Sequence, residues 1–267
     1  MRVGIFQGAG GSYGFSDKLS RLSAAITEHS DSVETKLDLV VCPELFASGY
    51  NVGDKLIACA ETENGPSYQA FAALARQHDT AFCYGYPQRS GDKIYNAAAF
   101  IGADGELLAN HRKQLNSPGS FEEDYFTPGN GTTALHYGGI NIAVLICYEV
   151  EFPESVRNAA ITGADLIVVP TALVDQWDVV ASKVVPTRAF ENGIWIAYAN
   201  HAGDENGFNY LGRSRIVAPD GNTIVDAGTE ENLISAEIDL QKVKAARTRL
   251  PYLRDFGKLN KGETFLD

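Results

Sequence analysis

The sequence predicts an α/β fold with mixed β-sheets, and three observations support this prediction. Short apolar runs with the composition of buried strands recur along the whole chain of 267 residues. Between them lie segments whose apolar residues follow the spacing of an amphipathic helix. One pair of strand-like runs is joined by the turn Ala103-Asp104-Gly105, which adds antiparallel pairing to the alternating pattern.

The expected strands are short runs, several of them apolar at nearly every position. This continuous apolar character is typical of strands that are buried on both faces of a sheet. The segment YNAAAFIGADGELLANHR is expected to form a hairpin around its turn. The strands are predicted at residues 2–7, 38–44, 80–87, 96–102, 140–147, 164–170, 194–200, 213–219 and 233–239.

Helices are predicted over residues 17–30, 66–78, 153–162 and 176–192. The first has apolar residues at helical spacing. The second and third begin with a proline, which a first helical turn tolerates because no N–H donor is needed there. The fourth contains Pro186, which is expected to kink it.

The chain length allows one large domain or two small ones. No internal repeat, low-complexity tract or linker-like change of composition divides the sequence. We therefore expect a single domain over residues 1–267.

Composition and charge exclude several classes of function. The formal net charge is −12, so the chain as a whole should repel nucleic acid and anionic membrane surfaces. No run approaches the ~18 apolar residues of a membrane span. We expect a cytoplasmic protein that binds neither nucleic acid nor membranes.

The cysteines and histidines give no sign of a metal site. The four cysteines lack CxxC spacing, and the five histidines form no HxH or HxxxH pair. Neither a disulfide framework, a metal nor a cofactor is expected.

Three reactive residues each follow an apolar run: Glu44 in PELFASGY, Lys113 in HRKQLNSPG and Cys147 in VLICYEVEF. Ligands of α/β sheets gather at the carboxyl ends of strands, so these residues can converge. A carboxylate can remove the proton of a thiol during attack, and an ammonium can stabilise the resulting oxyanion. The backbone N–H of Tyr148 is a candidate second oxyanion donor.

Each of these residues alone also has a structural interpretation. A single cysteine at a strand end is most often a small buried hydrophobe. Glu44 could cap a helix or pair with an arginine, and Lys113 belongs to a basic cluster that could lie on a solvated edge. His111 is an alternative base for a Cys–His pair, ranked below Glu44 because no residue can be named to orient it.

The contexts of these residues resemble the nitrilase, or carbon–nitrogen hydrolase, superfamily. The resemblance rests on PELFASGY, HRKQLNSPGSFEEDYFTPG and CYEVEFPESVR in this order. It continues through GADLIVVPTAL, RAFENGIWIAYAN and GRSRIVAPDG, and so covers almost the whole chain.

The resemblance implies an αββα sandwich that pairs into homo-oligomers, dimers or higher. It also implies roles for individual residues: Cys147 as nucleophile, Glu44 as general base and Lys113 as oxyanion stabiliser. Glu122 is the expected second glutamate, because it opens a match to the family's E-x-x-Y-F-T-P-G pattern; its acidic neighbours are the alternatives. A solvated acidic loop is the structural interpretation.

Further expectations concern the walls of the site. Thr171 and Ala172 in PTAL follow another strand and should supply backbone contacts to the substrate. Glu149 and Arg157 are expected to form a supporting ion pair. Tyr148 stands where nitrilases typically have a tryptophan, which favours the amidase and carbamoylase branches.

The sequence therefore predicts an enzyme that hydrolyses a small carboxamide to a carboxylic acid and ammonia through a cysteine thioester. PTAL and CYEVEFPE together resemble amidases that act on amino-acid-type amides. The alternatives are an N-carbamoyl amine or amino acid hydrolase, a nitrilase, and a non-catalytic binding protein.

Overall fold

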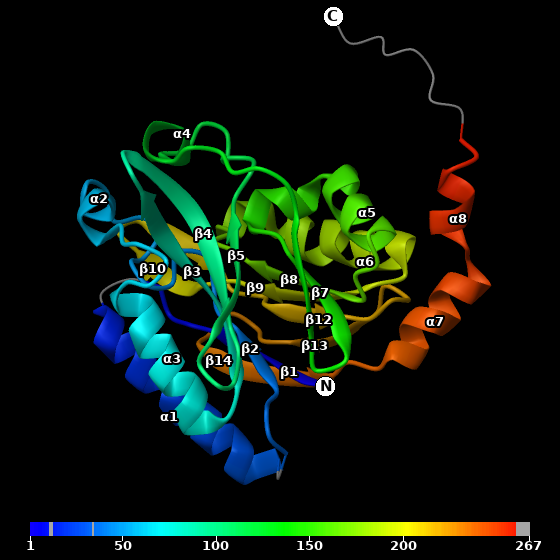
Figure 1. Cartoon of the computed structure of the whole chain (residues 1–267), viewed down its shortest axis with the longest axis horizontal. Helices are drawn as coiled ribbons and strands as arrows, with labels where there is room; N and C mark the ends of the chain where they lie inside the picture. Colours follow the sequence, from blue (N-terminus) through cyan, green and yellow to red (C-terminus); the bar gives the residue numbers. More distant parts are fainter. Residues whose placement is uncertain (11–12, 34, 260–267) are drawn as a thin grey trace, which may run out of the picture.

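The structure is a computed structural model that describes residues 1–10, 13–33 and 35–259. Two six-stranded mixed sheets lie face to face, and a small two-stranded sheet lies at their side. Helices α1 and α3 cover the outer face of the first large sheet, and α5 and α6 cover that of the second (Figure 1). This arrangement confirms the predicted α/β fold with an αββα sandwich.

The first sheet joins strands from both ends of the chain. Strands β1, β2 and β3 run parallel to one another, and the other neighbouring pairs of this sheet are antiparallel. Its strand order is β14 (Asn232–Glu237), β1 (Arg2–Gln7), β2 (Leu39–Val41), β3 (Ala81–Ser90), β4 (Lys93–Ile101) and β5 (Leu107–Arg112). Helices α1 (Phe15–Val33) and α3 (Pro66–His78) connect its parallel strands.

The second sheet is built in the same way from the later part of the chain. Strands β7, β8 and β9 run parallel, with antiparallel strands on both sides. Its order is β13 (Thr223–Asp226), β12 (Arg215–Val217), β9 (Trp195–Ala199), β8 (Leu166–Pro170), β7 (Ile140–Val144) and β6 (Thr133–Tyr137). Helices α5 (Pro153–Ile161) and α6 (Val185–Asn192) link the parallel strands, and the hairpin of β10 (Ala202–Glu205) and β11 (Phe208–Leu211) follows β9.

The central strands are buried on both faces, which explains their continuous apolar runs. In β2, Val41 packs into the core between the two sheets, whereas Val40 packs under α1 and α3. In β8, Val168 faces the core between the sheets and Ile167 faces α5 and α6. Each sheet is therefore held by an apolar layer on each side.

The predicted helix 176–192 is present for most of its length, but its turns are of different types. A short 3₁₀-helix covers Asp175–Trp177, a π-helical turn covers Val180–Val184, and α6 begins at Val185. Pro186 follows the π-helical turn inside an unbroken helical stretch, residues 178–192, because Val184 and Val185 at the junction both have right-handed helical dihedrals. The missing N–H of the proline is thus accommodated by a wider turn directly before it.

Several short elements were missed in the sequence. They include α2 (Lys55–Cys59), α4 (Glu122–Tyr125), α7 (Leu240–Arg249), α8 (Tyr252–Phe256) and the strands β6, β10, β11 and β13. Most of them are exposed on one side or only a few residues long, so their apolar pattern is weak.

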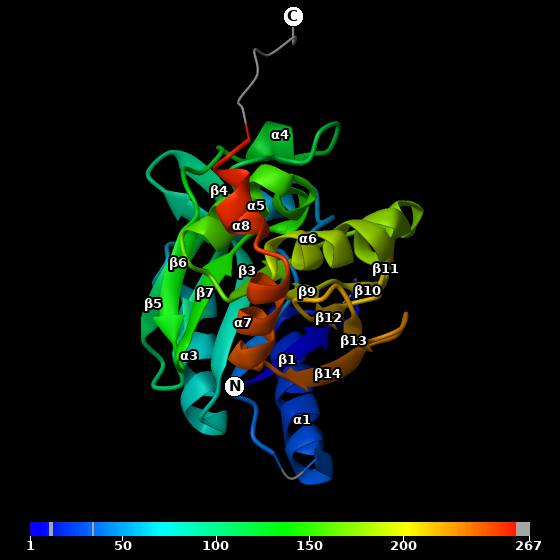
Figure 2. The same ribbon diagram turned by 90° about the vertical axis from the view of Figure 1, so that its right-hand side faces the viewer.

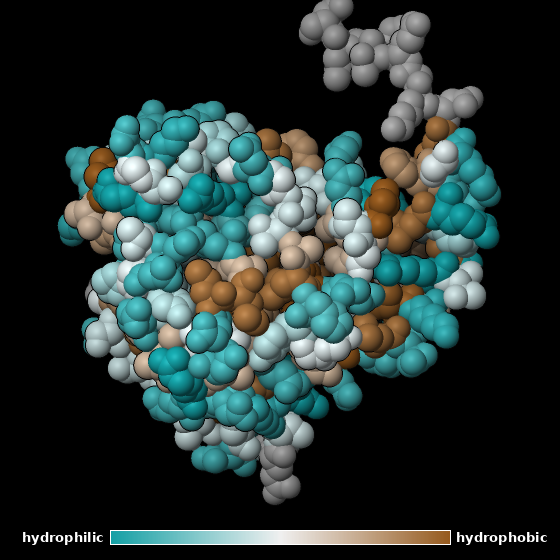
Figure 3. Space-filling view, viewed as in Figure 1, coloured by the Kyte–Doolittle hydropathy of each residue, from teal (hydrophilic) through white to brown (hydrophobic). Residues whose placement is uncertain are grey.

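The C-terminal helices α7 and α8 follow β14 of the first sheet and run along one side of the molecule, where they face the viewer in Figure 2. Hydrophilic side chains cover most of the face in Figure 3, while hydrophobic ones gather near its centre and beside these helices. Phe190 of α6 and Tyr252 of α8 are both partly exposed, and their ring centroids lie 6.0 Å apart. No helix in residues 1–10, 13–33 and 35–259 has both the length and the apolar character needed to cross a membrane.

Candidate active site

The two large sheets bring the ends of three strands together. Glu44 lies just beyond β2, Lys113 follows β5 directly, and Cys147 lies just beyond β7. β2 and β5 belong to the first sheet and β7 to the second, so the site is built where the two sheets meet. The strands 38–44 and 140–147 end earlier than predicted, which leaves Glu44 and Cys147 in the turns that follow.

Lys113 is the centre of a buried ionic cluster. Its Nζ lies 2.8 Å from Oε1 of Glu44 and 2.7 Å from Oε2 of Glu122. The three side chains are fully shielded from solvent. Glu123 and Asp124 are exposed, and Glu123 instead accepts a hydrogen bond from the backbone of Gly119. The structure thus brings Glu122, and neither of its acidic neighbours, to the lysine.

The charges of this cluster depend on one another. Burial raises the pKa of Glu44 to about 7, and the like charge of Glu122 adds to this effect, while Lys113 opposes it. The pKa of Glu122 is instead lowered, because burial is outweighed by Lys113 and by hydrogen bonds to the carboxylate. Burial would lower the pKa of Lys113, but the two carboxylates raise it, so the lysine stays charged. Glu44 is therefore the member that can exchange a proton near neutrality.

Cys147 is 7% exposed and starts a 3₁₀-helix that runs to Glu151. Its φ of 47° is unusual for a residue with a side chain and marks a sharp turn at the end of the apolar run. Burial raises the pKa of the thiol, as does the Glu44 carboxylate, against the effects of Lys113 and of the Ala172 backbone amide. The thiol is therefore protonated at rest and needs a base before it can attack.

Cys147 belongs to a short 3₁₀-helix that the sequence did not predict. The sequence places a helix start at Pro153, but the 3₁₀-helix of Cys147–Glu151 lies between the thiol and α5. Cys147 is the first residue of that shorter helix. The backbone N–H of Tyr148 lies in the first turn of this helix, where such groups lack an intrahelical partner, and is close to the cysteine by chain connectivity.

The expected ion pair between Glu149 and Arg157 is wrong. Glu149 turns back toward its own chain and accepts hydrogen bonds from the backbone of Ile146 at 2.6 Å and of Gln114 at 2.9 Å, while His111 Nε2 lies 2.9 Å away. The Arg157 guanidinium lies over the Phe256 ring, at 5.6 Å from its centroid. The hydrogen-bonding capacity of the buried Glu149 carboxylate is thus met by these nearby donors, and Arg157 is not needed as a partner.

His111 is occupied by structural contacts. Its Nε2 faces Glu149, and its Nδ1 lies 3.1 Å from the hydroxyl of Thr133. These partners fit a ring that donates from Nε2 and accepts at Nδ1. With both nitrogens engaged, His111 is a poor alternative base, and it helps to tie the end of β5 to the cysteine turn.

Two residues that contact the cluster were not singled out in the sequence. Asn96 donates from Nδ2 to Oε1 of Glu44 at 2.6 Å, and the Tyr50 hydroxyl donates to Oε1 of Glu122 at 2.6 Å. Both carried a weak signal: Asn96 is the polar first residue of a predicted apolar strand, and Tyr50 ends the segment PELFASGY. The other carboxylate oxygen of Glu44, Oε2, is buried without a hydrogen-bond partner in the described part of the chain.

The remaining predicted site residues lie beside this cluster. The carbonyl of Thr171 accepts a hydrogen bond from the backbone N–H of Glu44 at 3.3 Å. The backbone amide of Ala172 interacts with the Cys147 thiol. Tyr148 is partly exposed, and its ring packs against Phe152 with centroids 4.9 Å apart. Thr171 and Ala172 thus link the base and the thiol through their backbone.

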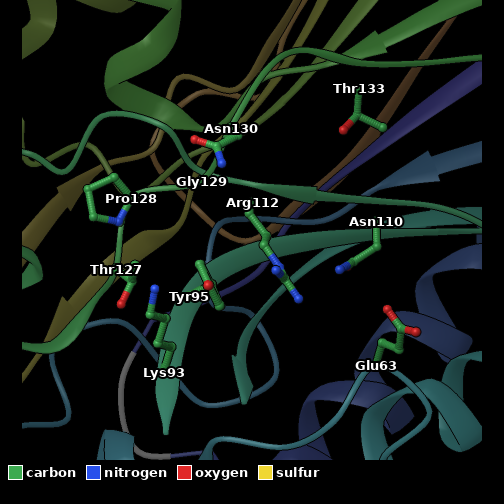
Figure 4. A pocket seen from close by; sticks show the side chains of 10 residues that line it. All are labelled: Glu63, Lys93, Tyr95, Asn110, Arg112, Thr127, Pro128, Gly129, Asn130 and Thr133. Atoms are coloured by element: carbon green, nitrogen blue, oxygen red, sulfur yellow. The ribbon is translucent and has the colours of Figure 1, made fainter. Parts of the chain in front are cut away.

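A separate polar cavity of about 360 Å³ lies on the opposite side of β5 (Figure 4). Arg112 and Tyr95 line it, and the guanidinium carbon lies 4.0 Å from the centroid of the ring. Successive residues of a strand point to opposite faces, so Arg112 points away from the cluster around Lys113. This cavity is not the candidate active site. Across residues 1–10, 13–33 and 35–259, no group of three or more His, Cys, Asp or Glu side chains could hold a metal ion.

Two facing mixed sheets, with a buried cysteine beside a glutamate–lysine–glutamate cluster at their junction, define an α/β enzyme of the hydrolase class. The carbon-nitrogen hydrolase family model matches residues 2–248. The chain belongs to this family, which is also called the nitrilase superfamily.

Relatives agree with this assignment over nearly the whole chain. A hydrolase in the pqqF 5' region of Pseudomonas protegens is 42% identical over 258 residues, which cover 96% of this chain and 88% of the relative. An (R)-stereoselective amidase of a Pseudomonas species is 31% identical over 265 residues, covering 98% and 94%.

Solved structures agree as well. The crystal structure of an amidase from Nesterenkonia matches with a TM-score of 0.82 and 32% identity, covering 96% of each chain. Another structure of that amidase shows the acetamide moiety of fluoroacetamide added covalently at its active-site cysteine. The protein is thus a hydrolase of carbon–nitrogen bonds other than peptide bonds.

Proposed function

We propose that the protein hydrolyses small carboxamides to the carboxylic acid and ammonia, with Cys147 as the nucleophile. The observation that carries this proposal is the buried cluster of Glu44, Lys113 and Glu122 next to a protonated, buried thiol. A base with a pKa near neutrality and a permanent buried cation are what an acyl transfer to sulfur requires. The amidase relatives support the same reaction.

In the first half of the reaction, Oε2 of Glu44 accepts the thiol proton while Sγ of Cys147 attacks the amide carbonyl carbon. The negative charge that develops on the carbonyl oxygen is stabilised by Lys113 and by the backbone N–H of Tyr148. Protonated Glu44 then gives its proton to the amide nitrogen, the C–N bond breaks, and ammonia leaves. The product is a thioester on Cys147.

In the second half, Glu44 accepts a proton from a water molecule that attacks the thioester carbon. The tetrahedral intermediate is stabilised by the same donors and collapses to the carboxylic acid, and sulfur recovers its proton from Glu44. Glu122 holds Lys113 in place and offers its carboxylate to the amide nitrogen of the substrate. Thr171 and Ala172 supply backbone contacts to the bound acyl group.

Amino-acid-type amides are the substrate class that we propose. Glu151 ends the 3₁₀-helix that Cys147 begins, and it is only partly exposed. Burial raises the pKa of its carboxyl, although Lys113 and Arg188 oppose this, and none of the described residues donates a hydrogen bond to its carboxylate. Such a carboxylate is available to bind an ammonium group on the substrate. Glu151→Gln should reduce turnover of amino-acid amides more than that of butyramide; equal effects would reject this role.

The central test is the substitution Cys147→Ala, read by ammonia release from a panel of small amides. We expect a loss of about 1000-fold or more with an unchanged circular dichroism spectrum. Cys59→Ala is the matched control, because this cysteine is exposed at the end of α2 and the substitution should leave activity unchanged. Full turnover by Cys147→Ala would reject the nucleophile.

The same panel separates the alternatives. An N-carbamoyl hydrolase would release carbon dioxide together with ammonia, and a nitrilase would act on nitriles. A non-catalytic binding protein would show no turnover, and Cys147 would be alkylated about as slowly as the other buried cysteines, Cys42 and Cys83. The labelling is best done in the Cys59→Ala background, because the exposed Cys59 would otherwise dominate the signal.

We also propose that the protein forms a homo-oligomer, a dimer or higher. Ile161, Phe190, Tyr252 and Phe256 of helices α5, α6 and α8 are exposed by 37 to 51% and would be covered in such an assembly. Native mass spectrometry tests this expectation, and a purely monomeric mass at micromolar concentration would reject it.

A further inference from the structure

A buried polar network outside the cluster connects the hairpin β10–β11 to the loop that carries the proposed base. This loop runs from Glu44 to Asn51 and begins with a sharp turn, since Leu45 has a φ of 49°. A residue with a side chain rarely adopts this conformation without support from its surroundings. The contacts that hold the loop therefore bear on the position of the Glu44 carboxylate.

His201 provides the first contact. Its Nε2 lies 2.7 Å from the main-chain carbonyl oxygen of Glu44, and the side chain is 1% exposed. Burial lowers the pKa of His201 to about 4, so the ring is neutral at physiological pH and donates from Nε2. The ring of Tyr210 packs against it, with centroids 5.0 Å apart. The imidazole is thus fixed against the base.

Glu205, at the end of β10, provides the second contact. Its Oε2 accepts hydrogen bonds from the backbone N–H of Tyr50 at 3.0 Å, the backbone N–H of Asn51 at 2.7 Å and the Tyr210 hydroxyl at 2.6 Å. The backbone of Gly49 also approaches closely, because a Cβ there would lie 2.5 Å from Oε1 of Glu205. Glu205 therefore holds the end of the loop that Glu44 begins.

Both ends of this loop touch the ionic cluster. Glu44 contacts Lys113 directly, and Tyr50 donates its hydroxyl to Glu122. The middle of the loop is held by Lys18 of α1, whose Nζ donates to the carbonyl of Phe46 at 3.2 Å. The hairpin β10–β11 therefore contacts one loop, residues 44–51, that connects to both carboxylates beside Lys113.

Resting on the proposed function, we infer that His201 and Glu205 are positioning residues that set Glu44 and Glu122 relative to the thiol. His201 acts on the peptide unit of Glu44, and Glu205 acts on Glu122 through Tyr50. Neither touches the reacting atoms. A displacement of the base by about 1 Å can cost about 100-fold in rate, so these contacts are large enough in effect to be measured.

The test compares His201→Phe with His201→Gln. Phenylalanine fills the space without a donor, whereas the glutamine amide can still donate to the carbonyl of Glu44. We expect His201→Phe to lower kcat by about 10- to 100-fold with a smaller change in KM, and His201→Gln to recover most of the loss. A loss in both variants that follows only the fraction of folded protein would overturn the inference.

A second readout does not need a substrate. In the Cys59→Ala background, the rate of Cys147 alkylation by iodoacetamide reports the base as a function of pH. His201→Phe should change the midpoint or the plateau of this profile, and His201→Gln should not. Unchanged profiles would overturn the inference, while a wild-type protein without amide turnover would reject only the proposed function.

Glu205→Gln is the variant to use if His201→Phe does not fold. It keeps the shape of the side chain and one acceptor oxygen but removes the charge. We expect about a 10-fold loss of kcat with thermal unfolding still cooperative. An unchanged kcat in Glu205→Gln would show that Glu205 does not position the site.

Discussion

Acidification below neutrality should switch off turnover, because Glu44 must be ionised to accept the thiol proton. Burial raises the pKa of this carboxyl, Lys113 opposes the rise and Glu122 adds to it, so that the pKa moves from an ordinary value of 4.5 to about 7. Because its pKa is raised, Glu44 takes up its proton at a higher pH than an ordinary glutamate does. The acid limb of the activity profile should therefore lie near neutrality.

The expected loss of activity at low pH is large enough to distinguish a Glu44 pKa of about 7 from the ordinary value of 4.5. Below its pKa, a base loses about tenfold of its ionised fraction for each pH unit. With a pKa of about 7, kcat/KM at pH 5 should be about 100-fold below its plateau. With the ordinary value of 4.5, most of the plateau activity would remain at pH 5. The profile reports the whole coupled cluster, so the midpoint is an apparent value.

The assay is ammonia release under kcat/KM conditions between pH 5 and 8.5 at constant ionic strength, with circular dichroism at each pH as a control for folding. Asn96→Leu provides an internal check, because Asn96 donates to Oε1 of Glu44 and thereby favours its ionised form. This variant should shift the acid limb of the activity profile to higher pH. A wild-type limb near 4.5, or an Asn96→Leu limb at lower pH, would refute the reasoning about Glu44.

Three other predictions follow from the same geometry. Lys113→Met leaves two buried carboxylates without their cation, so the free energy of unfolding should fall by about 3–5 kcal/mol and ammonia release by at least about 100-fold; chemical denaturation and initial rates measure the two effects. Gly85→Ala places a Cβ 2.2 Å from the backbone nitrogen of Leu45, and should lower kcat by about 100-fold, whereas Gly14→Ala, whose Cβ meets nothing closer than 3.9 Å, should be silent. Glu149→Leu removes the acceptor of three donors, two of them fully buried, and should lower the free energy of unfolding by about 3 kcal/mol; a change below about 1 kcal/mol in urea titrations would contradict this network.

The positions of the candidate site residues could be predicted because each follows a strand. Glu44 and Cys147 come after the buried strands β2 and β7, and Lys113 comes after the partly exposed edge strand β5. Ligands of α/β sheets bind at the carboxyl ends of strands, and the two sheets bring these three ends together. The choice of Glu122 needed the resemblance, since Glu123 and Asp124 have the same chemistry and lie next to it in the sequence. The structure separates them by burial, because only Glu122 turns inward to the lysine.

The polar contacts around the site could not be predicted in this way. Glu149 and Arg157 lie close together in the chain, but the partners of Glu149 are His111 of β5 and the backbone N–H of Ile146. Hydrogen bonds of one or two buried side chains depend on which loops meet in space. A sequence pattern of apolar and polar residues does not contain this information.

Burial on both faces of a sheet imposes a continuous apolar run on each central strand, so the α/β layers and the strand ends at Glu44 and Cys147 can be recognised in the sequence. What holds the reactive groups in place depends on tertiary contacts between distant segments. His201 is 157 positions from Glu44 in the chain, and Glu205 is 155 from Tyr50, yet each pair is in hydrogen-bond contact. Such contacts arise when two sheets and their connecting loops pack together, and the desolvation that accompanies this packing sets the pKa of the base.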